Sequence, residues 1–228
     1  METIVMSVGG SLIIPHEIDT NFLTNLKNFI TEETAGNRRF IIIAGGGRTA
    51  RNYQEAAQGV SELDHEDVDW LGIHATRLNG HLLRTILKTV AHPTMLTNPE
   101  DIKEVPETAK VVVASGYRPG ASTDLRAVQI AALMGANKVV NLSNTDYVYT
   151  DNPKTNQEAE KITTITWTNF KKLIPEEWNP GLSSPFDPVA ACEAEAKNIE
   201  VATINGDKLD DLKKYLDGEE FIGTRIHT

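Results

Sequence analysis

The chain contains little cysteine, few aromatic residues and no long apolar segment. Its 228 residues include one cysteine, and aromatic side chains make up 6% of the total. A single thiol cannot form an intrachain disulfide. Because Cys192 lies beside alanines in a helical pattern, we expect a buried small residue and not a nucleophile. No run of 18 apolar residues occurs and the first residues do not form a basic, apolar leader, so we expect a cytoplasmic protein that does not enter a membrane.

Basic residues are also in the minority. The chain has 22 lysines and arginines against 32 aspartates and glutamates, which gives a formal net charge of −10. Sequence-independent binding of nucleic acid requires a basic surface that releases phosphate counterions, so we expect no nucleic-acid partner. An anionic substrate would have to be bound by a local pocket, because the overall field of the protein repels it.

Runs of β-branched and other apolar residues alternate with helical patterns along the whole chain. Strands are predicted at residues 3–8, 40–44, 110–115, 138–142 and 200–204, and helices at 22–30, 49–57, 67–90, 123–134, 188–197 and 209–216. Continuous apolar strands are typical of a parallel sheet that is covered on both faces. The predicted fold class is therefore α/β, in one domain over residues 1–228. Turn residues predict loops at 98–108, 150–160 and 179–188.

Three of the predicted strands are followed at once by a glycine-rich segment. The segments are Gly9-Gly10-Ser11, Gly45-Gly46-Gly47 with Arg48 and Arg51 shortly after it, and Gly116 to Thr123. Glycine lets the backbone approach an anion closely, and the N–H groups at a helix N-terminus carry partial positive charge. Arginine adds bidentate contacts to phosphate. The pattern favours two phosphorylated ligands that meet in one cleft.

The second glycine segment also fits the loose pattern of a dinucleotide-binding loop, Gly45-x-Gly47-x-x-Ala50. That pattern requires an acidic residue about twenty positions later, at the end of a strand. Asp67 and Asp69 lie near that distance but open a predicted helix, which disfavours a nicotinamide or flavin enzyme. His74 and His81 do not have the spacing of zinc ligands, so no metal site is predicted.

Six motifs together resemble the amino-acid-kinase superfold, and within it the uridylate kinases of the archaeal type. They are Gly9-Gly10-Ser11, Gly45-Gly46-Gly47-x-x-x-Arg51, Asp69-x-x-Gly72-Ile73-x-Ala75-Thr76-Arg77-x-Asn79, Gly116-x-x-Pro119-Gly120-x-Ser122-Thr123-Asp124, Asn144-x-Asp146-x-Val148-Tyr149 and Asp187-Pro188-x-Ala190. The resemblance implies a three-layer α/β/α sandwich around a mainly parallel sheet. It also implies an acceptor-binding portion over about residues 1–135 and an ATP-binding portion over about 136–228.

The activity implied by the resemblance is phosphoryl transfer from ATP to UMP, with Mg²⁺ carried by ATP. The catalytic residues would be Gly10, Ser11, Arg48 and Asp187. The ATP-binding residues would be Gly9, Gly10, Ser11, Gly47, Arg51, Ser143, Tyr149 and Asn152. The UMP-binding residues would be Gly46, Arg51, Asp69, Gly116, Tyr117, Arg118, Pro119, Gly120, Ala121, Ser122 and Thr123.

The sequence departs from this family pattern at three places. The first strand contains the residues Ile4-Val5-Met6-Ser7 and no lysine to reach the phosphates, so Arg48 is the candidate for that cation. Tyr147 replaces a usual glycine and Asn152 a usual aspartate, which leaves the preference for the donor nucleotide open. Another small-molecule kinase, acting on an amino acid or a carbamate, is an alternative. A non-catalytic storage or regulatory protein that binds a nucleotide or anion is another.

The resemblance also implies a homo-oligomer, with a hexamer as the expected size. The predicted helix over residues 67–90 would supply the contact surface. Its main apolar stripe contains Leu71, Ala75, Leu78, Leu82, Ile86 and Val90. Trp70 and Leu83 lie off that stripe, and we expect them to be available for a second contact.

Overall fold

A seven-stranded sheet forms the centre of the computed structural model, which describes residues 1–120, 122–153, 155–179 and 184–228. The strand order is β3-β2-β1-β4-β8-β9-β7. The strands are β1 (Glu2–Val8), β2 (Arg38–Ala44), β3 (Val111–Ala114), β4 (Lys138–Ser143), β7 (Thr164–Thr166), β8 (Glu200–Asn205) and β9 (Thr224–His227). All pairs among β3, β2, β1, β4 and β8 are parallel, whereas β9 runs antiparallel to β8. The five strands predicted from the sequence are therefore confirmed, and they are the parallel part of the sheet.

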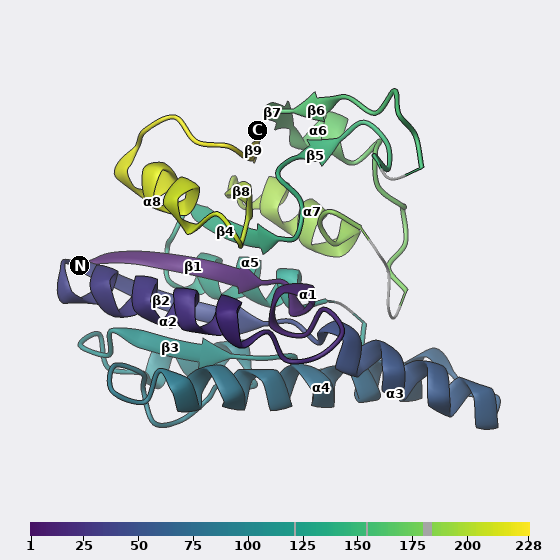
Figure 1. The fold of residues 1–228 in the computed structure, drawn as a ribbon, viewed down its shortest axis with the longest axis horizontal. Helices are drawn as coiled ribbons and strands as arrows, with labels where there is room; N and C mark the ends of the chain where they lie inside the picture. The colour runs from purple at the N-terminus through teal and green to yellow at the C-terminus, as the bar shows by residue number, and fades with distance from the viewer. Residues whose placement is uncertain (121, 154, 180–183) are drawn as a thin grey trace.

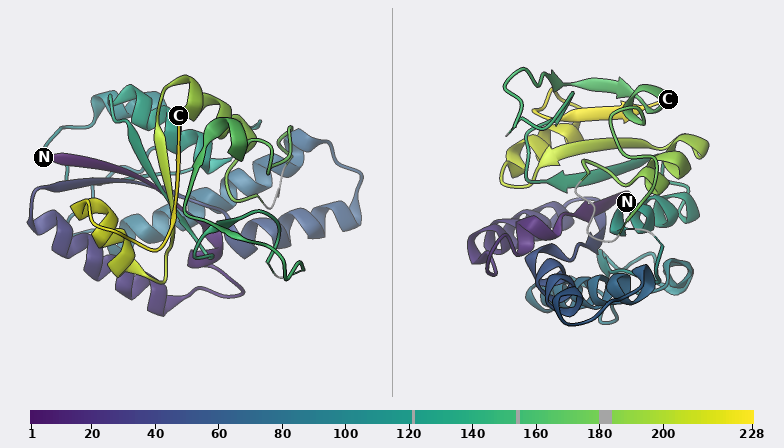
Figure 2. Two further views of the ribbon diagram at one scale, coloured as in Figure 1. Left: turned by 90° about the horizontal axis from the view of Figure 1, so that it is seen from above. Right: turned by 90° about the vertical axis from the view of Figure 1, so that its right-hand side faces the viewer.

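Helices cover both faces of this sheet (Figures 1 and 2). They are α1 (Gly10–Ile13), α2 (Thr20–Ala35), α3 (Gly47–Val60), α4 (His65–Ile86), α5 (Thr123–Leu133), α6 (Trp167–Phe170), α7 (Pro188–Ala196) and α8 (Leu209–Asp217). Successive strand residues point to opposite faces, so Val5 joins one buried cluster with α5 and α7 while Ile4 and Met6 join the other with α2 and α8. The predicted three-layer sandwich is confirmed.

The parallel strands end on the side where α1 and the start of α3 lie, and α3 extends beyond the sheet there (Figure 1). A two-stranded hairpin of β5 (Val148–Tyr149) and β6 (Lys161–Ile162) follows β4. The short 3₁₀ helix η1 (Pro99–Glu104) lies within the segment predicted as a loop at 98–108. Asn98 caps it by accepting a hydrogen bond from the backbone of Glu100.

The longest helix, α4, differs from its prediction in extent and in its buried face. It begins after Asp64, whose side chain caps it, and ends at Ile86, not at Val90. Leu78, predicted on the buried stripe, is 64% exposed, whereas Leu83 is fully buried. The sheet-facing side contains small residues such as Gly80, where an added Cβ would lie 2.5 Å from a sulfur atom. Close packing against β3 therefore selects the small-residue face, and Leu83 is not available for a second contact.

The expectation for Cys192 is also wrong, because its side chain is exposed on α7. The alanines Ala190, Ala191 and Ala194 form the buried face of this helix, and Cys192 points away from them. Among the described residues, we find no helix with the length and apolar composition needed to span a bilayer.

Candidate active site

The first two glycine segments lie against each other at the carboxyl ends of β1 and β2. An added Cβ on Gly10 would lie 2.0 Å from the backbone nitrogen of Gly47, so no larger residue fits at this position. Gly47 itself has a φ of +63°, which glycine adopts without strain. The two segments are joined by a hydrogen bond from the backbone N–H of Arg48 to the carbonyl of Ile14. Each segment opens a helix at this contact.

This contact forms the floor of a cavity of about 460 Å³, which we call the glycine cavity. Among the residues expected to bind phosphate or nucleotide, the structure brings Gly9, Gly10, Ser11, Gly46, Gly47, Arg51, Thr123 and Ser143 to its wall. The helix N-termini of α1 and α3 meet here, and their N–H groups and dipoles favour an anion. Arg51 is the arginine on the cavity wall and suits a bidentate phosphate contact.

Arg48 is not brought to the glycine cavity. Its guanidinium lies 3.7 Å from a carboxylate oxygen of Glu55, two helical turns further along α3, and its side chain is 39% exposed. Arg51 lies three residues later on the same helix, and it is the arginine that lines the glycine cavity. The structure therefore separates the two arginines that the sequence places together.

A buried carboxylate lines the same cavity and was not assigned a role from the sequence. The hydroxyl of Ser7 donates a hydrogen bond of 2.8 Å to Oδ1 of Asp124. Burial raises the pKa of Asp124 to about 6, and the bond from Ser7 offsets part of that rise. Asn141, on the neighbouring strand β4, also lines the cavity. The sequence signal for Asp124 was its place after the third glycine segment, one residue into α5.

The third glycine segment, residues 116–123, is fixed by two carboxylates. Asp69 on α4 accepts a 2.8 Å hydrogen bond from the backbone N–H of Gly120, and Asp187 accepts one of the same length from Ser122. The other oxygen of Asp187 caps α7. Burial raises the pKa of Asp69, although the N–H of Gly120 counteracts this. The structure thus places Asp187 as a support of the segment and Asp69 at its outer end.

Side chains of α4 donate hydrogen bonds to backbone carbonyl groups of the second and third glycine segments. Asn79 donates hydrogen bonds of 2.8 and 3.1 Å to the carbonyls of Gly45 and Gly46. Arg77 donates one of 3.1 Å to the carbonyl of Tyr117. These contacts explain why the motif on α4 contains an amide and a guanidinium, a role that the spacing alone did not indicate.

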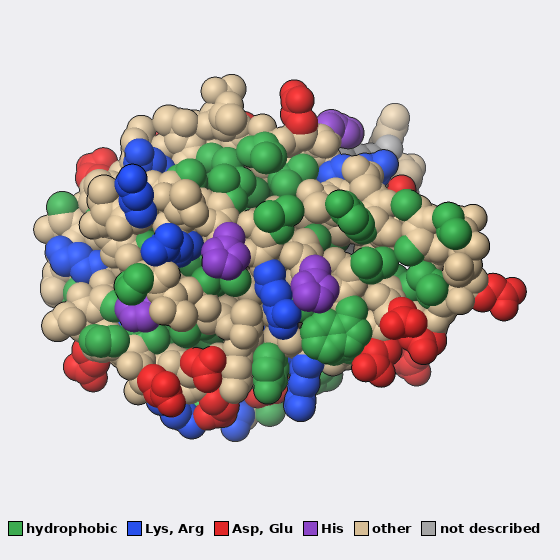
Figure 3. All heavy atoms as spheres, turned by 90° about the horizontal axis from the view of Figure 1, so that it is seen from below, with side chains coloured by type: hydrophobic (Ala, Val, Ile, Leu, Met, Phe, Trp, Pro, Cys, Tyr) green, Lys and Arg blue, Asp and Glu red, His purple; other side chains and the backbone are tan. Residues whose placement is uncertain are grey.

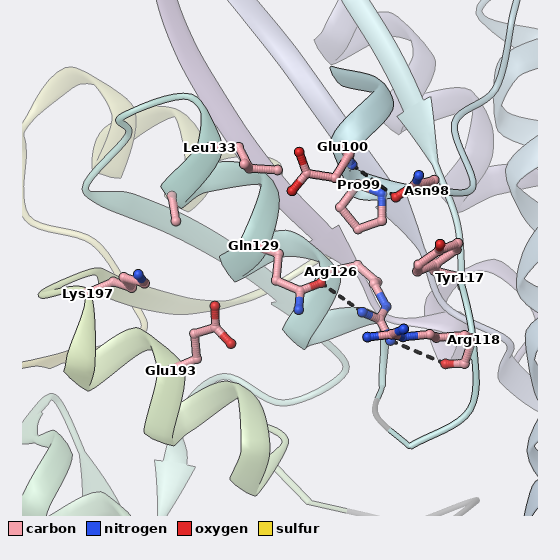
Figure 4. Close-up of a pocket in the computed structure, with 11 residues that line it drawn as sticks. Asn98, Pro99, Glu100, Tyr117, Arg118, Arg126, Gln129, Leu133, Glu193 and Lys197 are labelled. Carbon is pink, nitrogen blue, oxygen red and sulfur yellow. Dashed lines mark hydrogen bonds between the residues drawn. The ribbon is translucent and has the colours of Figure 1, made fainter. Parts of the chain in front are cut away.

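Residues 116–123 border two cavities other than the glycine cavity. Asp69, Pro119 and Gly120 line one of about 620 Å³, together with Trp178 and Val189. Tyr117 and Arg118 line another, of about 360 Å³, which we call the arginine cavity. Its remaining wall comes from η1, α5 and α7, as Figure 4 shows. Ala121, expected to bind UMP, lies outside the described residues.

Two of the residues expected to bind ATP, Tyr149 and Asn152, do not line the glycine cavity. Tyr149 lies on β5, where its ring packs edge-on to Tyr147 with centroids 6.3 Å apart. Asn152 lies in the turn that follows, and its backbone N–H bonds the side chain of Asp151. Nearby, Asp146 forms an ion pair of 2.7 Å with Lys208, which lowers the pKa of the carboxyl group.

A parallel α/β sheet with a glycine-lined anion cavity at the carboxyl ends of its strands defines a phosphate-binding α/β protein. The model of the amino acid kinase family matches residues 2–205. The chain belongs to the amino acid kinase family.

Relatives of known name extend over almost the whole chain. It is 33% identical to the uridylate kinase of Methanospirillum hungatei JF-1, covering 99% of this chain and 95% of the relative. It is 31% identical to the uridylate kinase of Hyperthermus butylicus, covering 95% of each. Among solved structures, the uridylate kinase from Archaeoglobus fulgidus superposes with a TM-score of 0.82 at 26% identity, covering 99% of this chain and 100% of that one.

Proposed function

We propose that the protein is a UMP kinase, which transfers the γ-phosphoryl group of ATP to UMP and releases ADP and UDP. The observation that carries this proposal is the glycine cavity, in which two helix N-termini and Arg51 converge beside the segment that Asp69 fixes. Relatives named uridylate kinase share this chain's length and about a third of its residues. With these two substrates, we place the reaction in the cytoplasm.

The glycine cavity suits the transferring phosphoryl group and the phosphates on either side of it. Backbone N–H groups of Gly10 and Gly47, at the starts of α1 and α3, supply donors that are fixed before the reaction begins. Arg51 binds the acceptor phosphate as a planar fork. A phosphate acceptor is already an anion near neutral pH, so no general base is needed, and catalysis consists of alignment and electrostatic stabilisation.

The donor set of the cavity fits Mg²⁺ that enters with ATP. Oxygen atoms of Ser7, Asp124 and Asn141 lie on its wall, and Mg²⁺ prefers oxygen ligands while retaining several waters. No cluster of three His, Cys, Asp or Glu residues suited to a metal occurs in the described part of the chain. ATP phosphates and water would supply the remaining ligands, and Mg²⁺ bound in this way would neutralise charge on the transferring group.

Asp69 is the proposed ligand of the UMP ribose. One of its oxygens accepts the N–H of Gly120, and the second is proposed to accept a ribose hydroxyl. Asp187 acts through position, because its bonds to Ser122 and to the start of α7 keep residues 116–123 at the cleft. Tyr149, on β5, and Asn152, in the turn between β5 and β6, are proposed to bind ATP.

An ADP-release assay across several acceptors tests the proposal. We expect turnover with UMP and Mg-ATP, and none with glutamate or carbamate, because the acceptor side offers Arg51 and Asp69 for a phosphate and a ribose. dUMP should be used less efficiently, because Asp69 then loses a partner at a cost of about 1–3 kcal/mol. Preferred turnover of an amino acid or carbamate would overturn the UMP assignment, and no turnover with any acceptor would favour a non-catalytic role.

The protein is also proposed to form a homo-oligomer through the face of α3 and α4. Hydrophobic side chains and histidines are intermixed on this face, which Figure 3 shows. Leu78, Tyr53 and Ile18 are exposed to between 50% and 64%. A groove of about 800 Å³ lies beside them, lined by Ile14, His16, Leu78, His81 and Leu82 among others. An apolar area of this kind is typical of a subunit interface.

A further inference from the structure

The arginine cavity contains two guanidinium groups that share one aromatic ring. The guanidinium carbons of Arg118 and Arg126 lie 5.6 and 5.7 Å from the ring centroid of Tyr117. Figure 4 shows both groups beside this ring, at the mouth of the space bordered by α5 and α7. Among the described residues, no carboxylate lies within 4 Å of either guanidinium. Neither guanidinium therefore forms a direct ion pair, and the carboxylates of Asp187 and Asp69 act on Arg126 only from a greater distance.

Arg126 is the less accessible of the two, with 4% of its surface exposed. Its terminal nitrogens donate to the side chain of Gln129 at 2.7 Å and to the carbonyl of Arg118 at 3.2 Å. Its buried Nε has no hydrogen-bond partner among the described residues. A buried donor without a partner costs free energy, and for a charged group the cost is higher. Burial and the charge of Arg118 both lower the pKa of Arg126.

The remaining charges on the wall do not neutralise this pair. Three basic residues line the cavity, Arg118, Arg126 and Lys197, against the two acidic residues Glu100 and Glu193. Glu100 already forms an ion pair with Lys103 on the surface of η1. Among the described residues of this wall, Glu193 is then the one carboxylate left beside three cations.

We propose that the arginine cavity is a second anion site, which binds a phosphate group between Arg118 and Arg126 outside the catalytic cleft. Arginine pairs match the geometry of phosphate oxygens, and an incoming phosphate supplies the direct ion pair that both guanidinium groups lack. Its volume of about 360 Å³ admits inorganic phosphate and also the phosphate end of a nucleotide. The amide of Gln129 and the apolar carbons of Leu133 border the rest of the space.

The site is connected to the proposed acceptor side through the backbone of residues 116–123. Arg126 bonds the carbonyl of Arg118, two residues before Gly120, which Asp69 binds from the other side. A phosphate that binds both Arg118 and Arg126 would therefore shift the backbone around Arg118 and, through it, the position of Gly120 beside Asp69. We expect an occupied site to change the KM for the acceptor more than kcat.

Isothermal titration of the full chain with inorganic phosphate tests the site itself. The protein is first saturated with UMP and a non-hydrolysable ATP analogue, so that the glycine cavity is occupied. We expect one further binding event, weakened at least tenfold in Arg118→Ala.

Because Arg118 is exposed, this variant should fold. Arg126→Gln should weaken binding similarly, with its fold checked by circular dichroism. Lys27→Ala, which removes one charge from exposed α2, is the matched control and should bind as the parent does.

A parallel titration with AMP separates the two sources of the phosphate group. Tighter binding of AMP than of phosphate identifies a nucleotide as the ligand, and equal binding identifies free phosphate. The proposal is overturned if the saturated parent binds neither probe, or if Arg118→Ala binds as tightly as Lys27→Ala. Because the readout is binding and not turnover, a failure of this site and a failure of the UMP kinase assignment are distinguishable.

Discussion

Ser7 and Asp124 form a pair at the end of β1, where a cation would otherwise be expected beside the phosphates. The carboxylate of Asp124 lines the glycine cavity and accepts a hydrogen bond from the neutral hydroxyl of Ser7. A neutral donor stabilises a carboxylate less than a cation does, so desolvation dominates and raises the pKa of Asp124 to about 6. With serine in place of lysine on β1, Asp124 therefore has a higher pKa than a carboxylate paired with a cation would have.

This raised pKa has a predictable effect on stability. The unfolded chain releases the proton of Asp124 near its ordinary pKa of 3.8, and the folded protein retains it to about pH 6. Folded protein therefore binds more protons in this window, and the free energy of unfolding falls as pH rises through it, by up to about 3 kcal/mol. Asp124→Asn should remove this loss, which chemical denaturation at pH 4.5, 6 and 7.5 would measure.

Ser7→Ala is the partner variant for this experiment. Removing the hydroxyl donor should raise the pKa of Asp124 further and extend the loss of stability to higher pH. An Asp124→Asn protein with the same pH slope as the parent would show that another group causes the dependence.

Arg51 and Arg48 offer a direct comparison of two arginines on one helix. Arg51→Ala should lower turnover and raise the KM for UMP, because Arg51 lines the glycine cavity. Arg51→Lys should recover only part of this loss, since a point charge lacks the two-pronged geometry. Arg48→Ala should have a far smaller effect, because Arg48 faces Glu55. A larger fall in kcat for Arg48→Ala than for Arg51→Ala would show that Arg48, and not Arg51, supplies the catalytic positive charge.

At the level of elements, the contact between the start of α1 and the start of α3 determines the glycine cavity. Gly10→Ala would place a methyl group 2.0 Å from the nitrogen of Gly47 and must separate the two helices. We expect loss of nucleotide binding and a lower midpoint of thermal unfolding. Gly59→Ala is the control, because nothing lies within 4 Å of its added Cβ on exposed α3. It should stabilise the protein by about 0.5–1 kcal/mol. An active, fully stable Gly10→Ala protein would contradict the close contact.

The elements differ in how well the sequence predicts them. The strands were predictable because continuous apolar residues such as Phe40 to Ala44 have no amphipathic alternative. The buried face of α4 was not, because this helix has an apolar stripe and a small-residue stripe, and only tertiary packing selects between them. Similarly, the glycine residues of the cavity followed from their place after strands. The different surroundings of Arg48 and Arg51 come from the conformation and contacts of each side chain, which helical spacing does not predict.

The whole molecule presents one face whose composition is unusual for an isolated subunit. The apolar stripe of α4 is divided, because Ala75 is 5% exposed and Leu82 and Ile86 are half-buried, whereas Leu78 is 64% exposed. Figure 3 shows hydrophobic side chains gathered across this face, with acidic groups toward its edges. Leu78 is therefore available for the contact with a second copy that the proposed oligomer requires.

Leu78→Glu tests whether a second copy covers this face. In a twofold interface the same residue contributes from both subunits, so the substitution removes two buried leucine side chains and introduces two charges. At about 2 kcal/mol for each leucine, dissociation should become easier by a factor on the order of 100 or more. Light scattering at micromolar concentration should show an assembly for the parent and a 25.1 kDa particle for the variant. Leu173→Glu, which changes a leucine with 38% exposure beyond α6, is the matched control and should assemble like the parent. A parent that scatters as a single subunit would contradict the oligomer, and a Leu78→Glu protein that assembles normally would place the interface on another face.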